Sequence, residues 1–181
     1  FPDMDRQLKL RPQTPNGFFA NGRSSQPHVP GTIARSTPIQ TASGPVFPYE
    51  DHPVNTGRIT GTTNFVELNP LVVDRALLER GRERYTINCM PCHGALGDGN
   101  GITKKYGMAV VANLHDKRIV QMPDGEIYNT LSYGKGLMQG YAGQVDLRDR
   151  WAIVAYVRAL QLARLGTTND VPASALEALR K

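Results

Sequence analysis

The sequence predicts an all-α domain that follows a long and largely irregular N-terminal arm. Residues 74–89 repeat apolar residues at spacings of three and four, as one face of a helix requires. Residues 146–160 are predicted to form a second helix, which is apolar around most of its circumference. By contrast, residues 1–68 hold nine of the thirteen prolines and show no sustained period of a helix or a strand. We therefore divide the chain into this arm, a helical domain at 69–166 and a polar C-terminal tail at 167–181.

Composition and charge narrow the classes of function. The 181 residues carry a formal net charge of +5, but lysine and arginine are scattered and form no block with aromatic residues, so nucleic acid is not an expected partner. No apolar run approaches the roughly 20 residues that a membrane-spanning helix needs. The best run is 151–157. Residues 1–6 lack the features of a secretion signal, so we expect a mature product whose leader has been removed.

The arm has too few aliphatic residues to bury a core of its own. Aromatic residues are nevertheless spread through it: Phe18, Phe19, Phe47, Tyr49 and Phe65. A stretch of about 70 residues without regular structure is unusual unless it is disordered or bound to another molecule. We expect the arm to bind partner proteins, and the alternative is a solvated flexible tail.

Residues 89–93 read Cys-Met-Pro-Cys-His, which is the attachment signature of a c-type haem. Cys89 and Cys92 would each add to a vinyl group of the porphyrin, and His93 would place a ring nitrogen under the iron as an axial ligand. A redox-active disulfide at this spacing normally belongs to a βαβ unit, whereas the residues before the motif are helical. A structural zinc site needs four ligands, and the chain has only these two cysteines. The motif therefore predicts one covalently bound haem c.

A helix that starts near Asp74 is expected to deliver this motif. Its apolar face contains Leu78, Gly81, Tyr85 and Cys89, at spacings of three and four. Glycine inside a helix costs up to about 1 kcal/mol relative to alanine. We therefore expect another helix to approach closely at Gly81.

Four glycines among residues 94–101 predict a loop that turns tightly after the motif. A phosphate-binding loop would follow a strand and end in Lys-Ser or Lys-Thr, and this segment has neither feature. We expect the loop backbone to pass close to the porphyrin edge.

Two further helices follow in the prediction. Asp124 is expected to cap a short helix that Gly134 ends. Asp146 is expected to open the last helix, which is apolar around most of its circumference and therefore largely buried.

The second axial position of the iron decides between electron transfer and ligand chemistry. Met138 is the predicted ligand, because it lies in a glycine-flanked loop at 134–141 where a thioether can reach the iron without straining a helix. The alternative role for Met138 is that of a core filler, which is common for methionine. His115 would instead give a bis-histidine haem of lower potential. Met108 and Met122 also rank below Met138, since they fall nearer the glycine loop and a helix start.

Four residues are expected to bury the porphyrin: Tyr85, Leu114, Tyr141 and Trp151. An apolar pocket disfavours the ferric charge and helps to hold the reduction potential up. With protein ligands at both axial positions the iron has no place for a substrate. We therefore expect an electron-transfer protein without an independent catalytic site.

These features together resemble a class I cytochrome c domain. More narrowly, the chain is similar to the mono-haem cytochrome c subunit (ActE) of bacterial alternative complex III, a quinol:electron acceptor oxidoreductase. In the domain the similarity lies in 79–85 (ERGRERY) and 149–161 (DRWAIVAYVRALQ). In the arm it lies in 18–24 (FFANGRS) and 30–35 (PGTIAR).

The resemblance implies a periplasmic position at the outer face of the cytoplasmic membrane, beside a multi-haem cytochrome and an iron-sulfur subunit. There the subunit would pass electrons from quinol oxidation to a soluble carrier or a terminal oxidase, in a respiratory or photosynthetic complex. Members of the family commonly begin at a lipid-modified cysteine, so the resemblance also implies a lipoprotein. The alternatives are a free periplasmic cytochrome c, for which the arm would be superfluous, and a ligand-binding or peroxidase-like haem protein with an open sixth position.

The chain departs from cytochromes of this type at two points. Gln139 follows Met138, where proline is frequent. No proline lies in 92–122, where its carbonyl would hold the second ring nitrogen of His93. We expect a backbone carbonyl near 112–114 to take that role, because such a partner fixes the ring and tunes the metal.

Overall fold

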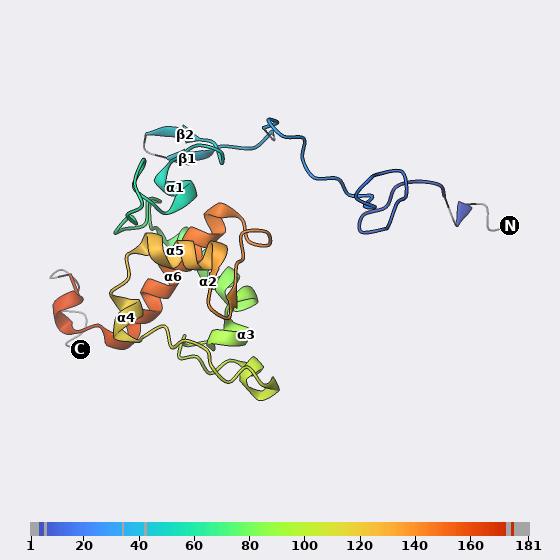
Figure 1. The fold of residues 1–181 in the computed structure, drawn as a ribbon. Coiled ribbons are helices and arrows are strands. Elements are labelled where there is room, and N and C mark those ends of the chain that lie inside the picture. The colour runs from blue at the N-terminus through green and yellow to red at the C-terminus, as the bar shows by residue number, and fades with distance from the viewer. Residues whose placement is uncertain (1–3, 6, 34, 42, 173–174, 176–181) are drawn as a thin grey trace. The chain divides into compact units, whose positions relative to one another are not determined.

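The computed structural model divides the chain into two units, Phe1–Arg35 and Ser36–Lys181 (Figure 1). It describes residues 4–5, 7–33, 35–41, 43–172 and 175.

The first unit contains an irregular loop that is closed by its own hydrogen bonds. The backbone N–H of Asn16 donates to the carbonyl of Gly22 at 2.9 Å, and that of Ser24 donates to Thr14 at 3.1 Å. Phe18 lies within this loop and is 87% exposed. The loop thus presents an aromatic side chain on a backbone that is already ordered.

The second unit is mainly helical, as predicted, and its described residues also form two small sheets that were not predicted. Its elements in chain order, with η for 3-10 helices, are β1 (Ile39–Thr41), β2 (Gly44–Val46), α1 (Pro53–Thr56), α2 (Arg75–Asn88), α3 (Met90–His93), η2 (Ile102–Tyr106), α4 (Lys117–Val120), α5 (Asp124–Tyr133), β3 (Gly134–Lys135), β4 (Met138–Gln139), α6 (Leu147–Leu165) and η3 (Thr168–Asp170). Both sheets are antiparallel pairs: Ile39 lies opposite Val46 in the first, and Gly134 lies opposite Gln139 in the second.

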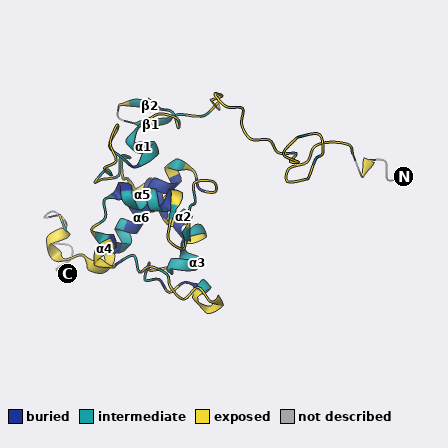
Figure 2. Ribbon diagram, in the orientation of Figure 1, coloured by how far each residue is buried: buried dark blue, intermediate teal, exposed yellow. Residues whose placement is uncertain are grey.

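Helices α2 and α6 pack against each other in the core. The helix α2 starts near Asp74, as predicted, and Asp74 caps it: its carboxylate accepts a hydrogen bond from the backbone N–H of Leu77 at 2.7 Å. A Cβ atom built on Gly81 would lie 2.0 Å from the carbonyl oxygen of Ala152 in α6. The predicted close approach at Gly81 is therefore confirmed, and Figure 2 shows α6 as largely buried.

None of the helices in the described part of the chain combines the length and the apolar character needed to cross a membrane.

Asp124 begins α5 but does not cap it, so that prediction is wrong. The backbone N–H of Asp124 donates to the carbonyl of Glu67 at 3.1 Å. The N–H of Gly125 donates to the carbonyl of Val66 at 3.0 Å. The carboxylate of Asp124 instead accepts from Nε of Arg158 at 2.6 Å. An irregular segment of chain thus supplies the acceptors that a capping side chain usually provides.

Residues 53–68 were predicted to belong to the arm, but they pack on the helices of the second unit. The side chain of Val54 is fully buried. The indole Nε1 of Trp151 donates to the carbonyl of Val54 at 2.6 Å, and the hydroxyl of Tyr128 donates to the carbonyl of Asn55 at 3.1 Å. This segment is therefore part of the helical domain.

Two glycines allow this close packing. A Cβ atom on Gly125 would lie 2.0 Å from the carbonyl oxygen of Gly57 and 2.8 Å from the backbone nitrogen of Val66.

The compact unit begins at residue 36 and not at 69. The predicted boundary was placed where the helical periodicity begins, and a lack of periodicity does not reveal whether irregular backbone is packed or free.

The predicted C-terminal tail begins just after α6. The described part of it contains η3, and residues 173–174 and 176–181 of the tail lie outside the described residues.

Candidate haem site

A cavity of about 910 Å³ brings most of the predicted haem residues together. Seven of the eight predicted site residues line it: Tyr85, Cys89, Cys92, His93, Leu114, Met138 and Tyr141. Its wall is completed by aliphatic side chains, among them Ile119, Leu131, Ile153 and Val157. A volume of this size, walled by apolar side chains with a few polar groups, is typical of a cofactor site. The residues present therefore fit a porphyrin.

Trp151 is the predicted site residue that does not line this cavity. Its ring is fully buried and stacks on Tyr128, with the ring centroids 4.2 Å apart. On α6 the cavity is lined by Ile153 and Val157, which are four residues apart and share one face of the helix. Trp151 belongs to another face, where it packs on Tyr128 and binds Val54. The periodicity of α6 could have identified Ile153 and Val157, but it could not say which face meets the haem.

The haem motif is held at the end of α2 by bonds to its own backbone. The hydroxyl of Tyr85, which is 1% exposed, donates to the carbonyl of Gly94 at 2.8 Å. The glycine loop then folds back onto the motif, and the N–H of Gly101 donates to the carbonyl of Cys92 at 3.1 Å. A Cβ atom on Gly101 would lie 2.2 Å from the carbonyl oxygen of Pro91. These contacts explain why the loop needs glycine: its backbone lies directly against the backbone of the motif.

The imidazole of His93 is held in one tautomer. Its Nδ1 lies 3.0 Å from the carbonyl oxygen of Ala112. A carbonyl can only accept, so Nδ1 carries the proton and Nε2 keeps a free lone pair for a metal. Burial lowers the pKa of His93, and the bond to Ala112 offsets this only in part, so the ring is favoured in its neutral form. The expectation of a carbonyl partner near 112–114 is confirmed.

Cys89 does not have the character of a redox-active thiol. Burial, with a smaller contribution from Cys92, raises the pKa of Cys89 to about 12. Reactive cysteines have lowered pKa values, because the thiolate is the nucleophile. Both cysteines are free, and among the described residues no three His, Cys, Asp or Glu side chains are grouped to hold a metal ion. The geometry thus favours haem attachment over thiol redox chemistry.

Met138 is positioned by a short hairpin. It lies on β4 opposite Lys135 of β3. Gly134 allows the hairpin to close, since a Cβ atom there would lie 2.4 Å from the carbonyl oxygen of Met138. The chain after the hairpin is bound to the end of α5, where the N–H of Tyr141 donates to the carbonyl of Leu131 at 2.9 Å. The predicted loop is therefore an ordered support that holds Met138 in the cavity wall.

The cavity wall also distinguishes the other candidate ligands. Met108 and Met122 line it together with Met138. His115 does not line it: its Nε2 lies 2.7 Å from the carbonyl oxygen of Leu96, within the glycine loop. The structure thus favours a methionine over His115 as the second axial ligand.

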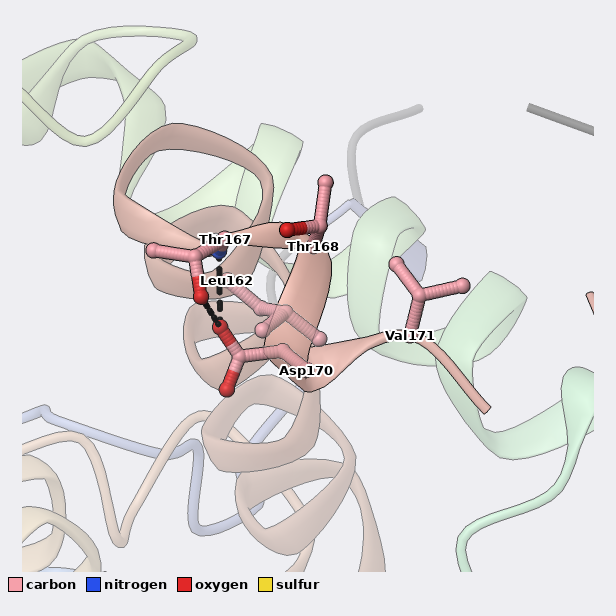
Figure 3. A pocket seen from close by; sticks show the side chains of 6 residues that line it. Leu162, Thr167, Thr168, Asp170 and Val171 are labelled. Atoms are coloured by element: carbon pink, nitrogen blue, oxygen red, sulfur yellow. Dashed lines mark hydrogen bonds between the residues drawn. The ribbon is translucent and has the colours of Figure 1, made fainter. Parts of the chain in front are cut away.

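A smaller pocket of about 310 Å³ lies at the C-terminal end of α6 (Figure 3). Leu162 and Val171 contribute apolar side chains to it. The carboxylate of Asp170 accepts hydrogen bonds from the backbone N–H and the hydroxyl of Thr167, at 2.7 and 3.0 Å. Because this carboxylate is engaged within the chain, we assign no ligand to the pocket.

The part of the chain that builds the large cavity is also the part that matches a known family. Residues 76–157 match the family model described as cytochrome C oxidase, cbb3-type, subunit III. This range contains the haem motif, Met138 and most of α6. Residues 76–157 form a c-type cytochrome domain. A c-type cytochrome domain binds a c-type haem and transfers electrons.

The other comparisons are less informative. No curated protein matches the chain. A solved structure described as a reducing HAO-like protein complex of Kuenenia stuttgartiensis is 19% identical, with a TM-score of 0.43. The match covers 60% of this chain and 54% of that chain, so this chain spans about half the length of the chain that it matches. At this level of similarity we draw no conclusion about function from it.

Proposed function

We propose that this protein transfers single electrons through one covalently bound haem c. The thioether bonds would be made by Cys89 and Cys92. The axial ligands would be His93 and Met138. The observation that supports this best is that His93, with its Nδ1 proton held by Ala112 and its Nε2 free, lines the same cavity as Met138.

The protein side chains tune the site rather than react in it. A haem c bound there supplies reversible one-electron chemistry at its iron. The aliphatic wall formed by Leu131, Ile153 and Val157 excludes water and disfavours the additional charge of the ferric state. Ala112 keeps the ring of His93 oriented. With both axial positions taken by side chains, the chain would have no catalytic site of its own.

The Met138→Ala substitution tests the axial ligand. Removing the thioether is expected to lower the reduction potential, because histidine–methionine ligation raises the potential of cytochromes c. It should also abolish the methionine-to-iron charge-transfer band of the ferric protein. Ferrous protein should then bind carbon monoxide readily, whereas the unmodified protein should not. Absorption spectroscopy and a redox titration measure all three changes.

Met108→Ala and Met122→Ala are matched controls, since both side chains line the same cavity. Neither control should change the spectrum. If one of them removes the charge-transfer band and Met138→Ala does not, the ligand is that methionine. If the unmodified protein binds carbon monoxide readily and all three variants behave alike, the ligand-binding or peroxidase-like alternative replaces electron transfer.

We further propose that the protein is a subunit of a membrane-bound quinol-oxidising complex at the periplasmic face of the cytoplasmic membrane. In this proposal it receives electrons from a multi-haem cytochrome, near an iron-sulfur subunit, and passes them to a soluble carrier or a terminal oxidase. Membrane association would come from these partners or from an upstream lipid anchor. The support is the similarity of segments 18–24 and 30–35 to alternative complex III, together with the exposed ring of Phe18 in the ordered loop.

Replacing Phe18 with serine tests this partner role. The ring is 87% exposed, so the substitution should leave the folding and the haem spectrum of the protein unchanged. It should reduce recovery of other complex subunits in a pull-down from solubilised membranes, because large aromatic side chains dominate interface energies. Leu162→Ser, at a side chain 57% exposed on α6, is the control and should not reduce recovery. A protein that purifies without partners under gentle solubilisation would instead support the free carrier.

A further inference from the structure

A buried glutamine on α6 binds the backbone near the histidine ligand. Gln161 is 4% exposed, and its Nε2 donates to the carbonyl of Leu114 at 2.7 Å. It does not line the haem cavity. Leu114 lies two residues after Ala112, whose carbonyl holds His93. Gln161 therefore contacts neither His93 nor the cavity, yet it is bonded to the segment that orients the ring.

The orientation of the Gln161 amide is fixed by its neighbour. Its Oε1 accepts a hydrogen bond from Nη1 of Arg158 at 2.8 Å. A guanidinium can only donate, so the amide oxygen must face Arg158 and the NH₂ group must face Leu114. Arg158 is held in turn by the carboxylate of Asp124, at 2.6 Å from Nε. The three side chains form a continuous series of hydrogen bonds from the start of α5 to Leu114.

The backbone around Ala112 has few other supports. The N–H of Leu114 donates to the carbonyl of Gly97 at 2.7 Å. Gly99 lies close on the same side of the chain, since a Cβ atom on it would be 2.8 Å from the carbonyl oxygen of Val111. These contacts press the segment against the glycine loop, and no helix takes part in them. The side chain of Leu114 packs against the apolar core. Among the hydrogen bonds of the described residues, that of Gln161 ties the backbone of this segment to α6.

We propose that Gln161 is a positioning residue for His93, acting through Leu114 and Ala112. By holding the carbonyl of Leu114 it keeps the carbonyl of Ala112 in reach of Nδ1 of His93. A histidine that donates such a hydrogen bond is a more basic metal ligand, so the bond stabilises the ferric state and lowers the reduction potential. The expected change in reduction potential rests on the proposed function. The hydrogen bonds that connect Gln161 to the Nδ1 proton of His93 do not involve Met138.

Two substitutions separate the parts of this arrangement. Gln161→Leu keeps a side chain of similar volume and removes both hydrogen bonds. Gln161→Glu keeps an acceptor for Arg158 but, as a carboxylate, cannot donate to Leu114. The matched control is Tyr128→Phe, which removes a different hydrogen bond from a buried side chain, to Asn55.

The haem-loaded full chain is used for the measurement. Solvent exchange of the His93 Nδ1 proton, followed by NMR in the ferrous protein, is expected to be roughly tenfold faster in Gln161→Leu and Gln161→Glu, the effect of weakening one hydrogen bond. The reduction potential should rise in both variants. Neither quantity should change in Tyr128→Phe.

The proposal is overturned if folded Gln161→Glu retains the exchange rate of the unmodified protein, or if Tyr128→Phe accelerates exchange to the same extent. If Gln161→Leu does not fold, Gln161→Glu alone decides, because it preserves the bond to Arg158. Failure of the proposed function would show differently, as ready carbon monoxide binding by the unmodified protein with no effect of Met138→Ala.

Discussion

Replacing Gly81 with alanine is expected to destabilise the cytochrome domain strongly. The added Cβ would lie 2.0 Å from the carbonyl oxygen of Ala152 and 2.7 Å from its carbonyl carbon. Both atoms belong to the backbone of α6 and cannot rotate away, so α2 and α6 must separate. Overpacking of this kind costs typically 1–3 kcal/mol and more where the backbone must move. The gain of about 1 kcal/mol in helix propensity does not offset it.

Chemical denaturation of the haem-loaded protein, followed by circular dichroism, measures this loss. We expect the free energy of unfolding to fall by about 3 kcal/mol or more, out of the 5–15 kcal/mol that is typical of a domain. Gly143→Ala is the control, since a Cβ atom there meets no heavy atom within 4 Å. It should change the free energy of unfolding by less than about 0.5 kcal/mol. Equal stabilities for the two variants would show that the helices are not in close contact at Gly81.

Deleting residues 1–68 is expected to unfold the domain, whereas deleting residues 1–35 should leave it intact. The longer deletion removes the buried Val54 and the acceptors of the Trp151 indole and the Tyr128 hydroxyl. It also removes the carbonyls that satisfy the first N–H groups of α5. Each buried polar group left without a partner costs about 1–3 kcal/mol. The sum of these costs and of the cost of exposing apolar surface that residues 36–68 cover approaches the whole free energy of unfolding of a domain.

Urea titration of both truncated proteins decides between the two boundaries. The chain that begins at residue 36 should unfold cooperatively, at the same urea concentration as the full protein. The chain that begins at residue 69 should show reduced helix content and no cooperative transition. A cooperative transition of the shorter chain at the same midpoint would restore the boundary at 69 and return residues 36–68 to the arm.

The two deletions also bear on the proposed partner role. Residues 53–68 pack on their own domain, so less of the predicted arm is available to a partner than the sequence indicates. Within the described residues, the exposed ring of Phe18 belongs to the first unit. We therefore expect any partner contact of the arm to depend chiefly on residues 1–35.

The features that were readable from the amino-acid order are those encoded by neighbours in the chain. The haem motif is five consecutive residues. The start of α2 near Asp74 follows from the spacing of the apolar residues after it, and Gly81 stands out because glycine is costly inside a helix. These signals act over one or two helical turns. Local sequence could therefore specify the cofactor and the helix that presents it.

The remaining features depend on contacts between segments that are far apart in the chain. Trp151 and Ile153 lie on different faces of α6, and only Ile153 lines the cavity. The packing of Trp151 on α5 and residues 53–57 decides which face meets the cavity. Irregular backbone caps α5 in place of Asp124, and Gln161 reaches Leu114 across 47 positions of sequence. Backbone carbonyls are the partners in each case, and every residue has one. The sequence pattern therefore cannot predict these bonds, which form only when the folded chain brings the two segments together.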